Sequence, residues 1–462
     1  MRYQGASSTN GDRMDKGRVV SIAKLVVFSA AGILLFLVPV RYGGSQEMMS
    51  GIVVSWVKAA LGQWFAPLLV CVVGVSAVVS LWHRVSPLSF ISKREGLDTM
   101  FSTSKFWIVV RVGGAALMAA VLLGVGPEWL ISEETGGNML YTVAPTCAAW
   151  YLVGGLFLPL LTDYGFIDLF ASLLRGVARP LFRIPGRSAV NCLSSWFGSS
   201  VCGTYLTISQ YEQGFYTGRE AVTIISCFSI LSVSFCSMIA SMLGLGHCFG
   251  AFYGTIAITG LVLAFLLPRI RPIRSIPDDY CDGAEKAVDE VAPQGVGRLA
   301  WGYCQALDRA AHAPGLGTAL SRGFVSALNM MVSTLPSIMM FGTVALVVAT
   351  HTNVFDYLGA PLGACLSLFG VPDAMEVGSI VLVGFADQFV PVVLGAAQAD
   401  VEVRFLVGAL CILQILYMTD IGALILTSKV PFSFPQMFLV YLERVLVSVP
   451  LVLILGHVFG VL

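Results

Sequence analysis

Two aspartates stand inside apolar stretches of this chain, where a charged side chain needs a structural or chemical reason. Asp387 lies in the segment 383–391 (Val-Gly-Phe-Ala-Asp-Gln-Phe-Val-Pro), and Asp420 lies in 417–422 (Tyr-Met-Thr-Asp-Ile-Gly). A charged side chain at mid-membrane depth costs about 2.5–3.5 kcal/mol on insertion scales. Each carboxylate could bind a cation, exchange a proton or contact a polar solute. The alternative is that each caps a broken helix and has no further role.

Small hydroxyl side chains gather in a second, uncharged segment, 198–204 (Gly-Ser-Ser-Val-Cys-Gly-Thr). Glycine lets the backbone approach a ligand closely, and hydroxyl groups offer hydrogen bonds without charge. Ser229 and Ser232 have the spacing of two side chains on one helix face, although serines so placed equally fit helix packing with the hydroxyl bonded to its own turn. The residues that we predict to bind a solute are Asn191, Ser199, Ser200, Thr204, Ser229, Ser232, Asp387, Gln388, Thr419 and Asp420.

The composition of the chain is that of a protein in a lipid bilayer. Of its 462 residues, 56% are hydrophobic and 12% are charged, whereas soluble domains average about 25% charged residues. The net charge is +0, which gives no sign of a nucleic-acid partner. The sequence has neither a G-x-x-x-x-G-K-[ST] loop nor an H-E-x-x-H motif, and its cysteines and histidines lack metal-ligand spacing. We expect no enzymatic activity and no cofactor, with H+ or Na+ as the ion that drives any coupled process.

The positions of the apolar runs predict the elements that hold these residues. The segments 188–213 and 376–398 are interrupted by glycine, proline and polar residues, and each is predicted to be two half-helices that meet at a polar tip. The expected fold is an all-α polytopic membrane protein with about nine transmembrane helices and two re-entrant helical hairpins in an inverted repeat. The predicted spans are 22–40, 64–82, 106–126, 139–161, 219–243, 248–268, 323–349, 403–426 and 436–460.

Lysine and arginine are distributed very unevenly between the connections. The stretch from Gly323 to Val403 contains neither, whereas the stretch from Leu174 to Arg219 contains many. The positive-inside rule predicts a cytoplasmic N-terminus and an outside C-terminus. Glu443 and Arg444 are adjacent near the start of the last span, so they cannot face each other, and we interpret the pair as an anchor at the cytoplasmic interface.

The two halves of the chain share an order of elements with reversed charge bias, which is typical of an inverted repeat. Residues 164–168 resemble 352–356, and a broken hairpin and two spans follow each. Coincidence among apolar segments is the alternative. The predicted organisation is a cytoplasmic tail (1–21), a three-helix scaffold region (22–138), a first repeat (139–268), a cytoplasmic loop (269–322) that serves as a linker or docking surface, and an inverted second repeat (323–462).

Several short motifs in this sequence match a known family when they are taken together. They are Ile-Pro-Gly-Arg-Ser-Ala (184–189), Phe-Ser-Ile-Leu-Ser-Val-Ser (228–234), Ile-Pro-Asp-Asp-Tyr (276–280), Gly-Phe-Ala-Asp-Gln-Phe (384–389), Tyr-Met-Thr-Asp-Ile-Gly-Ala-Leu-Ile (417–425) and Tyr-Leu-Glu-Arg (441–444). With these motifs the chain resembles the YjiH family of bacterial membrane proteins, which carry the gate, or nucleoside-recognition, domain. The resemblance implies a multi-pass protein of the bacterial inner membrane in which paired hairpins form a substrate site.

The residues and the resemblance together favour one function and leave an alternative. We expect a secondary transporter that moves a small polar solute, such as a nucleoside-like compound, an amino acid or a peptide, by alternating access and with H+ or Na+ coupling. The alternative is a membrane scaffold or one subunit of a complex with a second gate-domain protein. The expected partners are the lipid bilayer and the solute, with a homo-oligomer as a further option.

Overall fold

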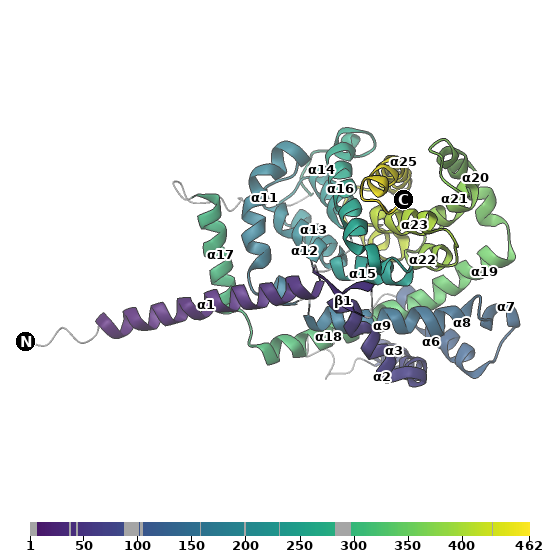
Figure 1. Cartoon of the computed structure of the whole chain (residues 1–462), viewed down its shortest axis with the longest axis horizontal. Coiled ribbons are helices and arrows are strands. Elements are labelled where there is room, and N and C mark those ends of the chain that lie inside the picture. The colour runs from purple at the N-terminus through teal and green to yellow at the C-terminus, as the bar shows by residue number, and fades with distance from the viewer. Residues whose placement is uncertain are drawn as a thin grey trace, which may run out of the picture.

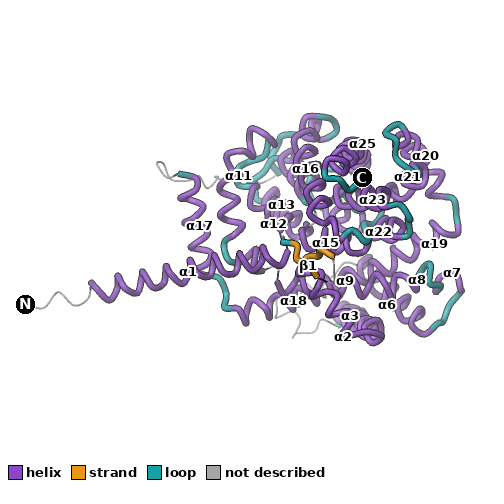
Figure 2. The backbone as a smooth tube through the Cα atoms, in the orientation of Figure 1, coloured by secondary structure: helices purple, strands orange, loops and turns teal. Residues whose placement is uncertain are grey.

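Helices make up nearly all of the regular structure, as Figures 1 and 2 show. The computed structural model describes residues 7–36, 38–42, 45–86, 101, 105–157, 159–197, 200–230, 232–281, 297–426 and 428–462. One antiparallel strand pair, β1 (Pro39–Tyr42) and β2 (Ser45–Met48), follows the first helix. The all-α prediction is confirmed apart from this short pair, which the sequence analysis did not foresee.

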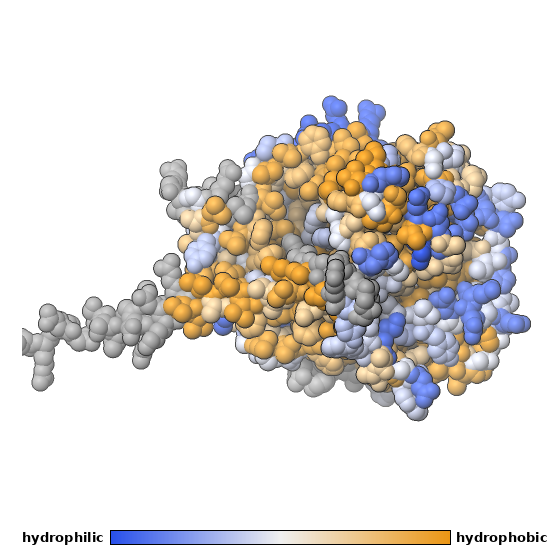
Figure 3. Space-filling model, viewed as in Figure 1, coloured by the Kyte–Doolittle hydropathy of each residue, from blue (hydrophilic) through white to orange (hydrophobic). Residues whose placement is uncertain are grey.

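In the described part of the chain, 8 helical runs are long and apolar enough to cross a membrane. The space-filling view accordingly shows broad apolar areas between smaller hydrophilic ones (Figure 3). The predicted run 64–82 is longer than expected, because the helix before it joins it into one run, Met49–Val85. The helices of these runs are α1 (Ser7–Phe36), α2 (Met49–Leu61), η1 (Gly62–Trp64), α3 (Phe65–Val85), α6 (Lys105–Leu123), α7 (Glu128–Ile131), α8 (Gly136–Asn138), η2 (Met139–Val143), α9 (Ala144–Phe157), α14 (Gly218–Phe228), α15 (Val233–Met242), η3 (Gly246–Cys248), α16 (Phe249–Leu266), η4 (Leu267–Arg269), η5 (Ile273–Ser275), α18 (Leu316–Ser337), η6 (Ile338–Gly342), α19 (Thr343–His351) and α25 (Phe434–Val458).

The predicted run 403–426 is not one continuous helix. It consists of α23 (Val401–Gln414), a non-helical stretch, the π-helix η7 (Met418–Gly422) and α24 (Ala423–Leu426). A single helix over 403–426 is therefore not found. The predicted span 219–243 is confirmed as the candidate membrane span Gly218–Met242, but it too is interrupted, between α14 and α15. The sequence signal failed within 403–426 because residues 415–417 are apolar, and within 219–243 because Ser229 and Ser232 have the spacing of one helix face.

The first helices of the two repeats cross in opposite directions. The run η2–α9 packs against α18–η6. At one end, a Cβ on Gly155 would lie 2.7 Å from the carbonyl oxygen of Gly323. At the other end, a Cβ on Gly342 would meet the side chain of Met139 at 1.8 Å. The absence of a side chain at these glycines therefore permits the two helices to approach closely. Because residue 139 lies against 342 and residue 155 lies against 323, the two helices run antiparallel.

The interrupted spans of the two repeats also run antiparallel, as the contacts between α15 and α23 show. Arg404, near the start of α23, donates from Nη1 to the carbonyl of Leu243, at the end of α15, over 3.3 Å. Ile230 and Leu413, from the opposite ends of these elements, both lie against Gly260. Equivalent elements that run antiparallel are what an inverted repeat requires. The predicted inverted architecture is therefore confirmed at the level of helix direction.

Each repeat contains a hairpin of two short helices. The first is α12 (Ser188–Phe197) with α13 (Ser200–Glu212), and the second is α21 (Ala374–Val383) with α22 (Phe389–Ala396). A helix of 10 residues is about 15 Å long, roughly half the thickness of the hydrocarbon core. The segments 188–213 and 376–398 are thus broken hairpins, as predicted, and neither is a single crossing helix.

The loop predicted at 269–322 contains an additional helix, α17 (Arg298–His312). It packs against α1 and against α11 (Phe166–Phe182), the helix before the first hairpin, as Figure 1 shows. Arg309 pairs with Asp168 at 3.4 Å, and the hydroxyl of Tyr164 donates to the carbonyl of Pro314 at 3.2 Å. Burial raises the pKa of this Tyr164 phenol, and the nearby charge of Asp163 adds to the shift. The remaining helices are α10 (Pro159–Thr162) and, before the second hairpin, α20 (Val354–Ser367).

Candidate functional site

Two spans of the protein are interrupted in mid-course. We call the residues between Phe228 and Val233 the first break and residues 415–417 the second break. A helix that ends inside a membrane leaves carbonyl groups without intrahelical partners, and such groups persist only where protein or water satisfies them. The groups that donate hydrogen bonds to these carbonyls therefore show how the two breaks are stabilised.

Arg444 of α25 binds the helix ends at both breaks. Its Nη1 donates to the carbonyl of Ser226 at 2.6 Å, and its Nε donates to the carbonyl of Leu413 at 2.7 Å. Nη2 also donates to Leu413. The side chain is fully buried, with 0% of its surface exposed. Its interpretation as an interface anchor was wrong, because Arg444 lies near the middle of a span and joins the two repeats.

Further side chains bind other carbonyls at the breaks. The indole Nε1 of Trp196, from the first hairpin, donates to the carbonyl of Phe228 at 3.1 Å. The hydroxyl of Tyr417, in the second break, donates back to the carbonyl of Cys411. Specific hydrogen bonds thus stabilise the non-helical backbone at both breaks, so each break has a defined geometry.

The second break has a strained backbone. Ile415 has φ 61° and ψ −43°, a conformation that a β-branched residue rarely adopts. The amide of Leu416 donates to the carbonyl of Gln414 at 2.6 Å, which closes a γ-turn around Ile415. Strain of this kind costs about 1–3 kcal/mol and clusters at functional sites.

Asn191, one of the residues predicted in the first hairpin, lies in a compact polar network. The two hydrogens of the Asn191 amide nitrogen are shared among three acceptors: the hydroxyls of Thr207 and Tyr216, at 3.1 and 3.2 Å, and Oε1 of Gln210 at 3.0 Å. Asn191 therefore fastens the two arms of the hairpin together and has a structural role in this conformation. Of the tip residues, Ser200 is buried, and Ser199 lies outside the described residues.

Two of the residues predicted to bind a solute, Thr204 and Ser229, lie in direct contact. Thr204 of α13 donates to the hydroxyl of Ser229 at 3.1 Å, so the first hairpin is bonded directly to the first break. Ser229 and Ser232 both lie in that break, and the Ser232 hydroxyl is 3.1 Å from that of Ser234. The prediction that Ser229 and Ser232 share one helix face was wrong, because the helix ends at Phe228.

Asp387 caps the second arm of the second hairpin. Its Oδ1 accepts hydrogen bonds from the backbone amides of Phe389 at 2.8 Å and of Val390 at 3.3 Å. A carboxylate at a helix N-terminus satisfies amides that would otherwise lack partners, and the helix dipole stabilises its negative charge. Asp387 is 3% exposed. The structure therefore agrees with the alternative in which Asp387 caps a broken helix.

The tip of the second hairpin is attached to the helices on both sides of the second break. The amide of Met418 donates to the carbonyl of Phe385 at 3.0 Å, and the thiol of Cys411 donates to the carbonyl of Gln388 at 2.9 Å. Thr419 and Asp420 follow Met418 in the π-helix η7, and their side chains lie outside the described part of the structure. The backbone thus places both residues next to the hairpin tip.

Each hairpin also contacts the broken span of the other repeat. The arm α13 packs against η7 and α24, and the arm α22 packs against α15. This exchange of contacts is the pattern that a two-fold relation between the repeats produces. The two broken spans therefore lie between the hairpins, and the candidate site is centred on the breaks with the hairpin tips around them.

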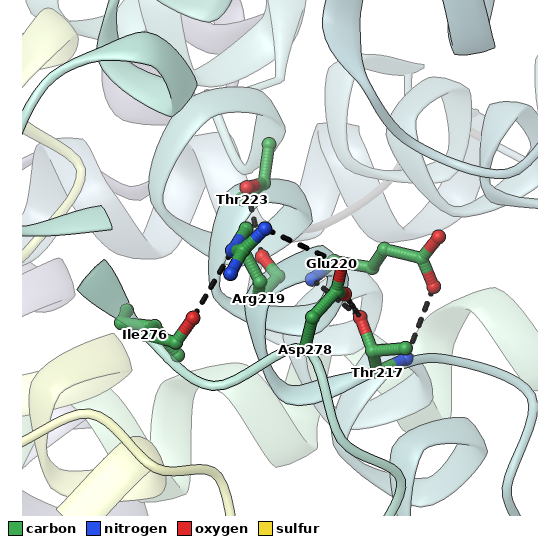
Figure 4. Close-up of polar contacts among 6 residues, drawn as sticks. All are labelled: Thr217, Arg219, Glu220, Thr223, Ile276 and Asp278. Atoms are coloured by element: carbon green, nitrogen blue, oxygen red, sulfur yellow. Dashed lines mark hydrogen bonds and ion pairs between the residues drawn. The ribbon is translucent and has the colours of Figure 1, made fainter. Parts of the chain in front are cut away.

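A loop clamps the start of α14, as Figure 4 shows. The hydroxyl of Thr217 accepts from the amide of Glu220 and donates to Oδ1 of Asp278 at 2.6 Å. Arg219 pairs with Asp278 at 3.3 Å and donates to the carbonyl of Ile276 at 3.0 Å. The motif 276–280, which contributed to the family resemblance, therefore holds the end of the span that carries the first break.

Arg444 is the main residue that the sequence analysis missed. A usable signal existed, because an ionisable residue inside a span is a candidate functional residue by default. Gln414 was missed as well, since nothing in the sequence marked the end of α23. Among the residues that the structure describes, no cluster of three or more His, Cys, Asp and Glu side chains could hold a metal ion.

Comparisons with known proteins place the chain in a family. A family model described as nucleoside recognition, the gate domain, matches residues 146–246, which include the first hairpin and the first break. An uncharacterized protein of Alkalihalophilus pseudofirmus is 35% identical over 436 residues, which cover 94% of each chain. The chain belongs to the YjiH family of bacterial membrane proteins with the gate domain, as the motifs suggested. The gate-domain match and the candidate spans support a membrane transporter.

Two solved structures also resemble this chain, both of CNTnw variants. One, in an intermediate 1 state, has a TM-score of 0.44 at 12% identity and covers 94% of this chain and 99% of its own. The other, in an outward-facing state, has a TM-score of 0.39 at 12% identity and covers 96% of this chain and 98% of its own.

Proposed function

We propose that this protein is a secondary transporter that moves a small polar solute across the bacterial inner membrane by alternating access. The observation that carries the proposal is the bridge from Arg444 to the carbonyls of Ser226 and Leu413. Through this bridge one side chain joins two interrupted spans that run antiparallel in the middle of the bilayer. Helices broken at mid-membrane supply exposed backbone groups that recognise polar solutes and ions.

The polar groups around the breaks suit a small solute that is not strongly charged. Thr204, Ser229 and Ser232 offer hydroxyl groups, and Gln388 and Gln414 offer amides, all of them buried. Both the nitrogen and the oxygen of the Gln414 amide lack a hydrogen-bond partner among the described residues. A buried amide without a partner is costly, so a bound solute or water is needed to complete it. Nucleoside-like compounds, amino acids and short peptides all carry matching groups.

In the proposed cycle, the hairpins move relative to the scaffold and open the breaks to one side at a time. Thr204 holds the first hairpin to its own repeat, and Met418 holds the second hairpin to its own repeat. Each hairpin can therefore move together with its own broken span. We propose a cytoplasmic N-terminus and an outside C-terminus for this cycle, on the basis of the positive-inside rule.

Reconstitution of the purified chain in liposomes tests the proposal. Uptake of labelled nucleosides, amino acids and dipeptides would be measured with an imposed H+ or Na+ gradient, after a thermal-shift screen has selected solutes that stabilise the protein. We expect accumulation of at least one class above empty liposomes. If correctly folded protein binds a solute but never moves it, the chain is a scaffold or one subunit of a larger complex, and the proposal fails.

A further inference from the structure

Glu443 carries an acidic group into the middle of a span. It is the neighbour of Arg444 in α25 and lies about 14 Å along the helix from its first residue, Phe434. This distance is close to half of the roughly 30 Å hydrocarbon core. Leu439 and Leu446, one turn before and one turn after it, are 46% and 40% exposed. Glu443 therefore lies at the edge of an apolar stripe that faces lipid.

The carboxyl group has no partner in the described structure. Its Oε2 is buried and accepts no hydrogen bond. Arg444 does not pair with it, because adjacent positions on a helix point about 100° apart and the guanidinium donates to Ser226 and Leu413 instead. An ionised carboxylate in this place would lack both water and a donor, whereas a protonated carboxyl group avoids most of that cost.

The surroundings of Glu443 offer little compensation for a negative charge. The helices that contact α25 include α16, α20 and α23, α21, whose Val381 accepts from Tyr441, and α14, whose Ser226 accepts from Arg444. Arg404 on α23 donates to Leu243, Arg219 at the start of α14 pairs with Asp278, and the other titratable groups on these neighbouring helices are acids, phenols or thiols, which cannot neutralise a carboxylate. Besides Arg444, the titratable and charged side chains of α25 and these helices are Tyr441, His457, Arg219, Glu220, Cys227, Tyr253, Asp356, Tyr357, Cys365, Glu376, Glu402, Arg404 and Cys411.

We propose that Glu443 is the proton-binding residue of this protein and that it carries the coupling proton of the transport cycle. The second part rests on the proposed transport function. Asp387 is less suited to this role, because two backbone amides and a helix N-terminus stabilise its charge. Glu443 is neutral in the conformation described here, and it releases its proton when the moving repeats give it access to water.

The position of Glu443 lets its protonation state influence the solute site through Arg444. Glu443 and Arg444 belong to one turn of α25, and Arg444 binds the ends of both broken spans. A new negative charge one position from Arg444 attracts its guanidinium through space, although the two side chains do not pair, and this attraction opposes the hydrogen bonds to Ser226 and Leu413. Ionisation of Glu443 thus weakens the bridge between the breaks, and protonation restores it.

The test compares the wild-type protein with E443Q and with the matched control E402Q, whose side chain lies in the first turn of α23. Infrared spectra of purified protein would follow the carboxylic-acid stretching band from mildly acidic to alkaline pH. We expect a protonated band that E443Q loses and E402Q keeps. The melting temperature of the wild type should also fall relative to E443Q as the pH rises, since only the wild type can acquire the unpaired charge. An unchanged band and an unchanged pH profile in E443Q would overturn the proposal.

Transport is measured separately, so that the two claims can fail separately. We expect E443Q to exchange solute across liposomes but to lose accumulation driven by a proton gradient. Accumulation at the wild-type level in E443Q would overturn the coupling role. If the wild type transports nothing but the band vanishes in E443Q, the proton site stands and the transport function fails. E443D, in which the band should shift and persist, replaces E443Q if the latter does not fold.

Discussion

Arg444 and Ser226 are 218 positions apart in the chain, yet Nη1 of Arg444 donates to the carbonyl of Ser226 at 2.6 Å. The same guanidinium reaches Leu413 in the other repeat. One planar group with donors pointing in several directions can serve two helix ends at once, which an ammonium group on a flexible stem cannot do equally well. The two repeats are therefore joined at the positions where their spans are interrupted.

The first prediction concerns this bridge. Arg444→Lys should lose at least one of the two carbonyl contacts, and Arg444→Met should lose both. Each lost hydrogen bond to a charged group is worth about 1.5–3 kcal/mol, so the melting temperature in detergent should fall in the order wild type, lysine, methionine. Arg179→Met is the control, because Arg179 is exposed. Equal stability of all four proteins would show that the bridge does not hold the breaks.

The second prediction separates the charge of Asp387 from its cap. Asn caps helices about as well as Asp, so Asp387→Asn should keep the protein folded and inserted, whereas Asp387→Ala should cost about 1 kcal/mol of stability. We expect Asp387→Asn nonetheless to abolish coupled uptake, because it removes the negative charge with which the hairpin tip would bind a cation or contact a polar solute. Asp400→Asn is the matched control, since Asp400 caps α23 by accepting from the amide of Glu402 at 2.8 Å. Wild-type uptake by Asp387→Asn would leave Asp387 as a helix cap only.

The third prediction concerns space at the first hairpin tip. Ser200 is 7% exposed, so a leucine at this position has to displace its neighbours, at a typical cost of about 1–3 kcal/mol. Ser200→Leu should block uptake while the protein still inserts in the membrane. Ser209→Leu, at a half-buried position further along α13, should transport normally. Undiminished uptake by Ser200→Leu would show that the tip does not line the path of the solute.

The fourth prediction addresses the loop that clamps α14. Asp278→Ala removes the contacts to Thr217 and Arg219, so the loop should detach more often and expose the buried thiol of Cys281. Loss of a charge-assisted hydrogen bond predicts an increase of about tenfold in the labelling rate of Cys281. Peptide mass spectrometry would separate this thiol from the exposed Cys71 and Cys304.

Asp279→Ala is a close control for this experiment. Asp279 contributes only its main-chain carbonyl to the clamp, by accepting from the amide of Gly218 at 2.8 Å. Its replacement should leave the labelling rate of Cys281 near that of the wild type. Equal rates for both variants would mean that the Asp278 side chain does not hold the loop.

The sequence by itself determined the membrane class, most of the spans, the hairpins and the inverted order of the repeats. These follow from the length of apolar runs and from charge bias, which are local properties of the chain. The segments 188–213 and 376–398 could be identified as hairpins because glycine, proline and polar residues interrupt them. The family could be recognised from short motifs for the same reason, since each motif is continuous in sequence.

Only the tertiary structure decided where the spans break and what holds the breaks. The residues from Ser229 to Ser232 have the spacing of a helix face, and Gln414 to Tyr417 continue an apolar run, so local patterns predict helix in both places. The helices end there because partners distant in sequence, Trp196 and Arg444, satisfy the carbonyls that the breaks release. A hydrogen bond between residues far apart in the chain leaves no periodic trace in either segment, and for this reason the centre of the site became visible only in three dimensions.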